Sequence, residues 1–568
     1  MYTGTSASPG IALGKALIYE QEELIIEKKE INSVKEETNR FDEALQISKK
    51  ELKEVKQKAL EELGEDKAAI FEAHLMVLDD PELINSTKSK IESENLNAEF
   101  AFKTIIDQFI QMFESMDNEY MRERAADIKD VSGRVLRHIL GKTVVDLANL
   151  EEEVIVVASD LTPSDTATMN KEKVLGFLTD IGGRTSHSAI MARSLEIPAV
   201  VGLKDITKKV NNDDYVVFNG DTGEIIVNPD IETKEKYKKL KNDYENMKRE
   251  LQQLIGEESI SDDGRKVEIA GNIGTPNDIE GLENNDAEGV GLYRTEFLYM
   301  NRDKLPTEEE QFESYKKVLE SMNPKPVVIR TLDVGGDKNL PYLELEKEMN
   351  PFLGYRAIRL CLDKKEIFIT QLRALLRASK YGKLRIMFPM ISSLEELLEA
   401  KEVLENVKKD LDSENIEYSN DIEIGIMIEI PAAAVMSDIL AKHVDFFSIG
   451  TNDLIQYTTA VDRMNEKIHH LYSFFSPAVL KLIKMTIDNG HKEGIWVGMC
   501  GEMAGDQKLI PILLGMGLDE FSMSPISILP ARRLIRSLKY EDAKRIADKV
   551  VTMGKAEDIE NYMSEVLD

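Results

Sequence analysis

The chain has 568 residues, and at about 100–200 residues per domain this length predicts three or four domains and excludes a single small module. Its 104 acidic residues outnumber its 72 basic residues and give a net charge of −32, the wrong sign for a protein that binds DNA or RNA by neutralising phosphates. Hydrophobic residues make up 42% of the chain, so several packed cores can form.

The chain has two cysteines, Cys361 and Cys500, which excludes a disulfide framework and a cysteine-rich metal site. Its first residues, MYTGTSASPGIALGKA, lack the basic segment and apolar core of a signal peptide. The sequence also lacks an apolar run of about 18 residues that could span a bilayer. We therefore expect a soluble protein of the reducing cytoplasm that does not insert into a membrane.

Residues 1–23 begin as weak strands, and residues 24–143 then show the pattern of amphipathic helices. In that second segment apolar residues recur three or four positions apart among Glu and Lys. A coiled-coil spacer would show the same spacing. Pro81, a break at Gly64 and several separate amphipathic blocks favour a compact helical bundle instead.

Short apolar runs such as EVIVVASDL and VLGFLTD replace the helical pattern over residues 144–229. The turn residues GDTG at 220–223 separate two strand-like runs and predict a β-hairpin. Because the first residues of the chain resemble these strands, we expect 1–23 and 144–229 to form one small α/β domain. The helical bundle would be an insertion into that domain.

Residues 230–256 form a charged helical segment that cannot build a core alone, and we expect a linker helix. From 257 to 568, apolar strands alternate with helical segments, and seven or eight βα units in about 310 residues predict a (β/α)₈ TIM barrel. A doubly wound open sheet is the alternative. The expected fold is a multidomain α/β protein whose active site lies at the C-terminal ends of the barrel strands.

In the small domain, the strand-like run VLGFLTD leads through a glycine turn to His187. Thr185 or Ser186 can cap the helix that follows, and Pro198 lies beyond its end. Free backbone N–H groups and the helix dipole would stabilise a phosphoryl group on His187. A packing or capping histidine fits the same spacing, so the pattern alone does not assign this role.

Polar residues recur in the barrel where its strands should end. Arg294 follows GVGLY, Arg330 follows PVVI, Glu429 lies in IGIMIEI, and Asn452 and Asp453 end FFSIGTND. Two arginines suit an anionic substrate held by planar guanidinium groups. Two carboxylates suit Mg²⁺ better than Zn²⁺. Isolated charges after strands are usually ordinary loop residues, but these converge on one predicted face.

Cys500, in WVGMCGEMAG, also follows a strand on that face. A buried cysteine is most often a small hydrophobic residue. A thiol tuned by its surroundings can exchange a proton with a substrate carbon. The residues alone leave both interpretations open.

Longer motifs of the chain resemble known enzymes. The phosphohistidine segment of phosphoenolpyruvate (PEP)-dependent enzymes is similar to GGRTSHSAIMARSLEIPAVVG. Their PEP-binding barrel is similar, in the same order, to GLYRTEFLYM, RTLDVGGDK, NPFLGYRAIR, IMIEIP, SIGTNDLIQYTTAVDR and GMCGEMAGD. The match covers the whole chain. It most resembles the Enzyme I family of the bacterial PEP:sugar phosphotransferase system, the PEP-protein phosphotransferases.

The resemblance implies a role for each matching residue. His187 would accept the phosphoryl group on Nε2, and Thr166, in DLTPSDTA, would orient its imidazole. Cys500 would be the proton donor. The remaining implied roles are substrate binding by Arg294, Arg330, Asn452, Asp453 and Arg463, and Mg²⁺ binding by Glu429 and Asp453.

The resemblance also implies the activity. The family transfers the phosphoryl group of PEP to its own histidine, releases pyruvate, and passes the group to a histidine of the phosphocarrier protein HPr, the first step of sugar uptake. HPr would dock on the helical domain, where acidic residues suit a positively charged carrier. The barrel would also pair two copies as a homodimer. Transfer between two partners requires a domain movement, with hinges around 230–255 and near 24 and 144.

Two other functions share parts of this pattern. Pyruvate phosphate dikinase and PEP synthase resemble the chain in the histidine domain and the barrel, but they also need an ATP-grasp domain. Only about 150 residues precede the histidine domain, and they read mostly as helices without a nucleotide-binding loop. A nitrogen-related paralogue of Enzyme I acts as a regulatory phosphorelay protein and carries an extra N-terminal sensory domain, which we do not expect here.

Overall fold

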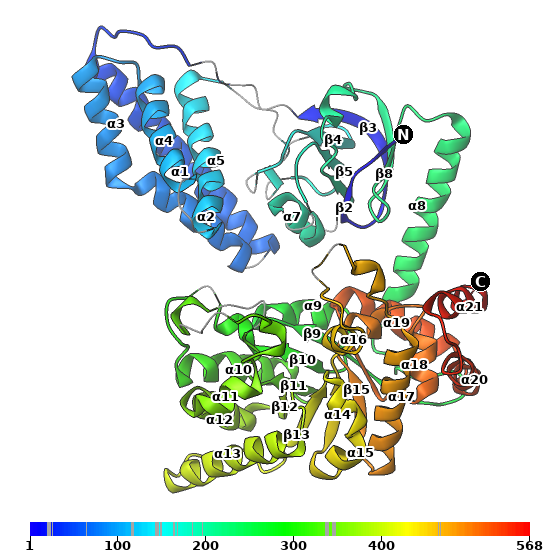
Figure 1. The fold of residues 1–568 in the computed structure, drawn as a ribbon. Helices are drawn as coiled ribbons and strands as arrows, with labels where there is room; N and C mark the ends of the chain where they lie inside the picture. The colour runs from blue at the N-terminus through cyan, green and yellow to red at the C-terminus, as the bar shows by residue number, and fades with distance from the viewer. Residues whose placement is uncertain are drawn as a thin grey trace. The chain divides into compact units, whose positions relative to one another are not determined.

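The computed structural model divides the chain into two compact units, Met1–Lys248 and Arg249–Asp568 (Figure 1). The first unit holds a mixed sheet and a group of helices, and the second holds a closed barrel. The expected multidomain α/β fold with a TIM barrel is therefore confirmed. The structure describes residues 1–567 except 20–23, 25, 64, 115–118, 143–146, 148–149, 163–164, 167–168, 184–185, 196, 301, 336–339, 344–347, 464 and 466.

The first unit is built on an eight-stranded sheet of order β1-β8-β7-β3-β4-β5-β6-β2. Strands from the N-terminus of the chain pair with strands that follow the helices, as β3 does with β4 in parallel and with β7 antiparallel. The predicted hairpin joins β7 to β8, with Asn219 opposite Glu224. The strands are β1 Tyr2–Thr3, β2 Thr5–Ser8, β3 Ile11–Tyr19, β4 Val154–Ala158, β5 Val174–Thr179, β6 Ala199–Val201, β7 Tyr215–Asn219 and β8 Glu224–Val227.

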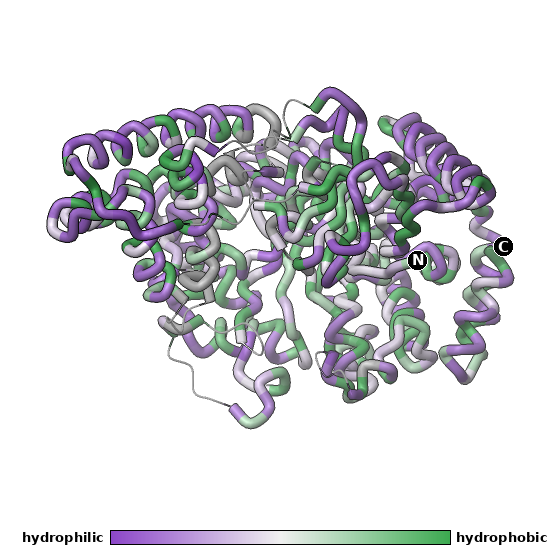
Figure 2. The backbone as a smooth tube through the Cα atoms, turned by 90° about the horizontal axis from the view of Figure 1, so that it is seen from above, coloured by the Kyte–Doolittle hydropathy of each residue, from purple (hydrophilic) through white to green (hydrophobic). Residues whose placement is uncertain are grey.

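Five long helices lie between β3 and β4 and pack around a core of their own (Figure 1). Hydrophobic residues recur along helices that are otherwise hydrophilic (Figure 2), and on α1 the buried Phe41, Leu45 and Leu52 follow that spacing. A shared core favours the compact bundle over a coiled-coil spacer. The break expected at Gly64 lies outside the described residues. The helices are α1 Val34–Leu63, α2 Glu65–Asp79, α3 Pro81–Glu94, α4 Ala98–Glu114 and α5 Glu119–Leu140.

The expected linker helix is α8, Ile231–Gln252. Its one fully buried residue among those described is Tyr237, which packs with Ile11, Leu13 and Val217 of the sheet. The first part of α8 is thereby fixed to the first unit. Among the helices of the described chain, none is both long and apolar enough to cross a membrane.

The second unit is a closed barrel of parallel strands in which β16 pairs with β9. The open-sheet alternative is therefore wrong, because closure leaves no free edge strand. The strands are β9 Glu268–Ile273, β10 Val290–Arg294, β11 Pro326–Arg330, β12 Lys383–Phe388, β13 Glu423–Ile428, β14 Phe446–Ile449, β15 Trp496–Met499 and β16 Glu520–Met523. The α-helices of this unit are α9 Ile279–Asn284, α10 Glu308–Met322, α11 Ile358–Asp363, α12 Lys365–Ala378, α13 Leu394–Ser413, α14 Pro431–Val435, α15 Ser437–Leu440, α16 Thr451–Thr459, α17 Pro477–Lys492, α18 Ile510–Met516, α19 Pro525–Ser537, α20 Tyr540–Val550 and α21 Ala556–Leu567.

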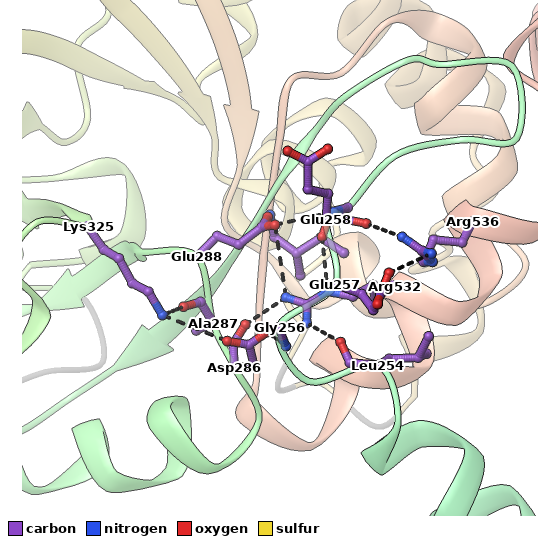
Figure 3. A network of polar contacts seen from close by, with 12 residues as sticks. Leu254, Gly256, Glu257, Glu258, Asp286, Ala287, Glu288, Lys325, Arg532 and Arg536 are labelled. Carbon is purple, nitrogen blue, oxygen red and sulfur yellow. Dashed lines mark hydrogen bonds and ion pairs between the residues drawn. The ribbon is translucent and has the colours of Figure 1, made fainter.

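A buried arginine on α19 fixes the segment after α8 to the barrel (Figure 3). Arg532 donates to the carbonyl of Leu254 at 3.0 Å and to the Asp286 carboxylate at 2.6 Å. Asp286 also accepts from the Gly256 N–H at 2.8 Å. Because a buried charge is stable only when its donors are satisfied, this network makes the turn after α8 part of the barrel unit.

A second buried charge cluster lies at the N-terminal ends of the barrel strands. Arg385 lies 3.5 Å from Glu268 and Glu520 and 3.1 Å from Glu423, with its guanidinium over the Trp496 ring. Both carboxylate oxygens of Glu520 are buried without a hydrogen-bond partner in the described chain. Burial, and then the charge of Glu268, raises the pKa of Glu520 to about 8.

We predict that Glu520→Gln reduces the pH dependence of barrel stability. A carboxyl whose folded pKa lies above its unfolded value contributes stability that is full below pH ~4.5 and is lost as the pH rises through about 8. Wild type should therefore lose on the order of a few kcal/mol more than the variant between pH 5 and 9.

Urea unfolding followed by the fluorescence of Trp496, the single tryptophan of the chain, reports on this end of the barrel. Glu405→Gln is the matched control, because Glu405 is exposed and paired only with Lys408 among the described contacts. Equal pH slopes for wild type and Glu520→Gln would contradict the prediction.

Candidate active site in the barrel

A cavity of about 310 Å³ lies at the C-terminal ends of the barrel strands. Its lining comes from five strand ends and from the loops that follow them. The barrel residues that the sequence singled out all line this cavity, namely Arg294, Arg330, Glu429, Asn452, Asp453, Arg463 and Cys500.

Strand register brings the first two arginines together. Arg294 and Arg330 are the last residues of β10 and β11 and lie opposite each other in the parallel pairing. The Arg294 side chain has no hydrogen bond or ion pair to another described residue, so its guanidinium is available to an anion. Two neighbouring guanidinium groups form a surface that suits phosphate or carboxylate oxygens.

The first turn of α16 supplies Asn452, and the loop after this helix supplies Arg463. Asn452 accepts a hydrogen bond from the Tyr472 hydroxyl at 3.1 Å, which fixes its amide. Arg463 follows the helix, and its backbone N–H donates to Gln456 at 3.1 Å. The helix and the loop behind it therefore face the strand ends across the cavity.

Four further charged residues that the sequence motifs did not single out also line the cavity: Glu296, Asp333, Arg356 and Glu502. Arg330 donates to Glu296 at 2.8 Å and contacts Asp333 at 2.9 Å. The signal was present for two of them, because Glu296 and Asp333 stand two and three residues after Arg294 and Arg330. Arg356 follows no strand, so local pattern gave no reason to select it.

The electrostatics of the cavity are dominated by burial. Burial, followed by the negative charges of Asp453 and Asp333, raises the pKa of Glu429 to about 8. Burial would lower the pKa of Arg330, but Glu296, Asp333 and Glu429 raise it above its usual value. The arginines therefore stay charged, whereas burial and the neighbouring carboxylates favour the protonated form of Glu429.

The donor set of the cavity fits Mg²⁺. Asp453 Oδ1 is buried without a hydrogen-bond partner in the described chain. Glu429, 2% exposed, accepts from the Met390 N–H on Oε1 at 2.6 Å, which orients the carboxylate. No group of three or more His, Cys, Asp or Glu arranged for a metal occurs among the described residues. Mg²⁺ commonly uses one or two carboxylates and completes its shell with water and substrate phosphates.

Cys500 follows β15 and lines the cavity while remaining 3% exposed. Its Sγ lies 3.8 Å from the Ile449 carbonyl oxygen. Burial raises the pKa of its thiol to about 11. At neutral pH the group is a protonated thiol, which can donate a proton but is a weak nucleophile.

His187 begins α7, His187–Leu195, in the first unit. Ser186 caps this helix as expected, since its hydroxyl accepts the Ala189 N–H at 3.3 Å, and Gly182 supplies a turn with φ +121°. The side chain of His187 and the alternative cap Thr185 lie outside the described residues. Thr166 is buried, and its hydroxyl donates to the Thr162 carbonyl at 3.1 Å. Its role beside the imidazole stays a prediction.

Protein families match the chain in three segments. The family described as PEP-utilising enzyme, PEP-binding domain, matches residues 248–540. The N-terminal domain of PEP-utilising enzymes matches residues 3–124, and their mobile domain matches 150–223. The barrel and the candidate His187 segment therefore fall in two separate matched domains.

Curated relatives match almost from end to end. The phosphoenolpyruvate-protein phosphotransferase of Bacillus subtilis (strain 168) is 58% identical over 562 residues, 99% of both chains. The protein of the same name from Staphylococcus carnosus (strain TM300) is 56% identical over 99% of this chain and 98% of its own. A solution structure of Enzyme I (nEIt) is 51% identical, covers 43% of this chain and 100% of its own, and has a TM-score of 0.40.

We predict that neither cysteine of the folded chain reacts readily with iodoacetamide at pH 7.5. Cys361 and Cys500 are both buried, and burial raises the pKa of both thiols. Labelling should be at least ~100-fold slower than for free cysteine, because the thiolate is the reactive form. Mass spectrometry would assign the label, with urea-unfolded chain as the control. Rapid native labelling of Cys500 would show that its thiol is activated.

Proposed function

This chain belongs to the family of PEP-utilising enzymes, and we propose that it transfers the phosphoryl group of PEP to its own His187 and then to a histidine of the phosphocarrier HPr. The observation that carries the proposal is the joint presence of Arg294, Arg330, Glu429, Asp453 and Cys500 around one barrel cavity. The relatives that match the chain over 99% of its length are PEP-protein phosphotransferases. The activity is thus a phosphotransferase reaction with a phosphohistidine intermediate.

PEP binds in the cavity through its two anionic groups. Arg294 and Arg330, opposite in register, provide planar donors for the phosphoryl oxygens. Asn452, whose amide is fixed by Tyr472, and Arg463 give further contacts from the α16 side. Donors on both sides of the cavity orient the substrate for reaction.

Phosphoryl transfer forms a bond from phosphorus to His187 Nε2 and breaks the bond from phosphorus to the enol oxygen. The transition state is loose and carries its charge on the equatorial oxygens. The guanidinium groups stabilise that charge without moving, because ion pairs already hold Arg330. In the small domain, Thr166 orients the imidazole, and the N-terminal N–H groups of α7 stabilise the phosphohistidine.

Cys500 completes the reaction. The enolate of pyruvate accepts the thiol proton on its methylene carbon, and the thiolate then regains a proton from water. The raised pKa of about 11 keeps the thiol protonated at neutral pH. The favourable conversion of the enol to the keto form of pyruvate makes PEP a strong phosphoryl donor.

Glu429 and Asp453 are the residues that would hold Mg²⁺. Asp453 Oδ1 is buried without a hydrogen-bond partner in the described chain, and the Met390 N–H orients the Glu429 carboxylate. When bound, Mg²⁺ supplies positive charge near the phosphoryl oxygens.

The proposal extends to partners. His187 must meet PEP first and HPr afterwards, so the small domain, residues 1–23 and 144–229, must move relative to the barrel. HPr docks on the helical domain, residues 24–143, and the barrel, residues 257–568, forms the homodimer, as the family resemblance implies. The two buried free cysteines are compatible with a reducing cytoplasm.

Incubation with phosphorus-labelled PEP and Mg²⁺ tests the proposal. We expect acid-labile label on wild type, none on His187→Ala, and transfer of the label to added HPr. Label that appears only with ATP would favour dikinase chemistry and overturn the proposal. Label that HPr does not remove would point to a different carrier.

We predict that Cys500→Ala lowers the rate of pyruvate formation by ~10²–10⁴-fold, the range typical of a lost general acid. PEP affinity should change less than threefold, because the thiol makes no bond to the anionic groups. Steady-state pyruvate release gives the rate. Cys361→Ser is the matched control, since Cys361 is a buried cysteine outside the cavity lining. Equal rates for wild type and Cys500→Ala would remove the thiol from the reaction.

A further inference from the structure

We propose that Asp333 is a positioning residue that fixes the two buried arginines of the cavity, Arg330 and Arg356, in one arrangement before PEP binds. The proposal rests on the proposed function, because it concerns the same cavity and substrate.

The carboxylate of Asp333 bridges the two guanidinium groups. Its Oδ2 lies 2.9 Å from Arg330 Nη1, and its Oδ1 lies 2.9 Å from Arg356 Nη2. The side chains of Asp333 and Arg356 are each 2% exposed, and that of Arg330 is 7% exposed. Two like charges so poorly screened by water would repel each other strongly without a carboxylate between them. The distance between the arginines therefore depends on Asp333.

The backbone that carries Asp333 is held on one side by a buried amide. Gln371 accepts the Leu332 N–H at 2.8 Å and donates to the Thr295 hydroxyl at 3.1 Å. Thr295 in turn donates to the Arg330 carbonyl at 2.8 Å. The loop after β11 thus has a fixed path, which sets the position of the Asp333 backbone relative to the strand ends.

The backbone that carries Arg356 is fixed as well. Ala357 has φ +52° and ψ −124°, a strained conformation for alanine, and its N–H donates to the Val334 carbonyl at 3.0 Å. Gly335 has φ +112°, and a Cβ there would lie 2.4 Å from Arg356 Cβ. Strain of this kind persists only where the surroundings require it, and here it joins the Arg356 segment to the Asp333 loop.

Some of the remaining donors have other protein partners, since Arg356 Nη1 donates to the Tyr457 hydroxyl at 3.3 Å. Glu296 binds Arg330 Nη2 at 2.8 Å, and Arg356 also lies 3.4 Å from Asp453. The Nε atoms of Arg330 and Arg356 are buried without a hydrogen-bond partner in the described chain. Asp333 acts through the arginines, since it sets the direction in which their other N–H groups face the cavity.

If Asp333 only balanced charge, its substitution would change PEP binding in the opposite direction from a loss of positioning. Asp333→Asn adds one positive charge to the cavity, so pure charge balance predicts tighter binding of the anionic PEP. Loss of positioning predicts weaker binding, because the arginines separate. Asp333→Glu keeps the charge but displaces the carboxylate by one methylene group. Charge balance then predicts unchanged affinity, and positioning predicts a loss.

The experiment measures PEP binding with Mg²⁺ by calorimetry on the full chain carrying His187→Ala, which cannot be phosphorylated there. We expect Asp333→Asn and Asp333→Glu to weaken binding at least tenfold, about 1.4 kcal/mol. With His187 intact, both should also lower the rate of its phosphorylation at saturating PEP by at least tenfold. Asp488→Asn is the control, since Asp488 pairs with Lys484 on α17 and is 55% exposed.

Thermal unfolding measured in parallel identifies a variant that fails to fold. If one of Asp333→Asn and Asp333→Glu does not fold, PEP binding by the other tests the proposal. Unchanged or tighter PEP binding by a folded variant would overturn the proposal. If the proposed function itself is wrong, the His187→Ala parent with Asp333 intact would not bind PEP. This result is distinct from a wrong role for Asp333, in which the parent binds PEP and the variants bind it equally well or more tightly.

Discussion

Buried guanidinium groups at the mouth of the barrel depend on carboxylates that lie against them, and the rest of the site depends on this pairing. Arg330 contacts Glu296 and Asp333, and Arg356 contacts Asp333 and Asp453. Removing either sign of charge would leave the other buried and uncompensated. The same pairing aims the arginines at the cavity, so charge compensation and substrate binding come from one arrangement.

Both ends of the barrel hold buried arginines among carboxylates, but the surroundings of these charges differ. At the N-terminal ends of the strands, Arg385 lies among carboxylates and against Trp496. At the C-terminal ends, the charges face a cavity of about 310 Å³. In this fold the C-terminal ends of the strands usually hold the active site, and the N-terminal ends contribute stability.

Some site residues could be predicted because they end apolar strands. Arg294 and Arg330 are the last residues of β10 and β11 and stand out as charges after buried runs. Asp333 and Glu296 stand close after the same strands, but their positions alone give no sign of whether the side chains turn inward. Arg356 follows no strand, and only the path of the long connection after β11 brings it to the cavity.

The sequence by itself determined the order of helices and strands, because hydrophobic periodicity is a local property, and it predicted the insertion of the helices into the first sheet and a barrel. Only the tertiary structure decided that the barrel closes between β16 and β9 and that Asp333 lies between Arg330 and Arg356. Such contacts join residues far apart along the chain, and they form when parallel strands bring their C-terminal ends to one face. No local pattern encodes them.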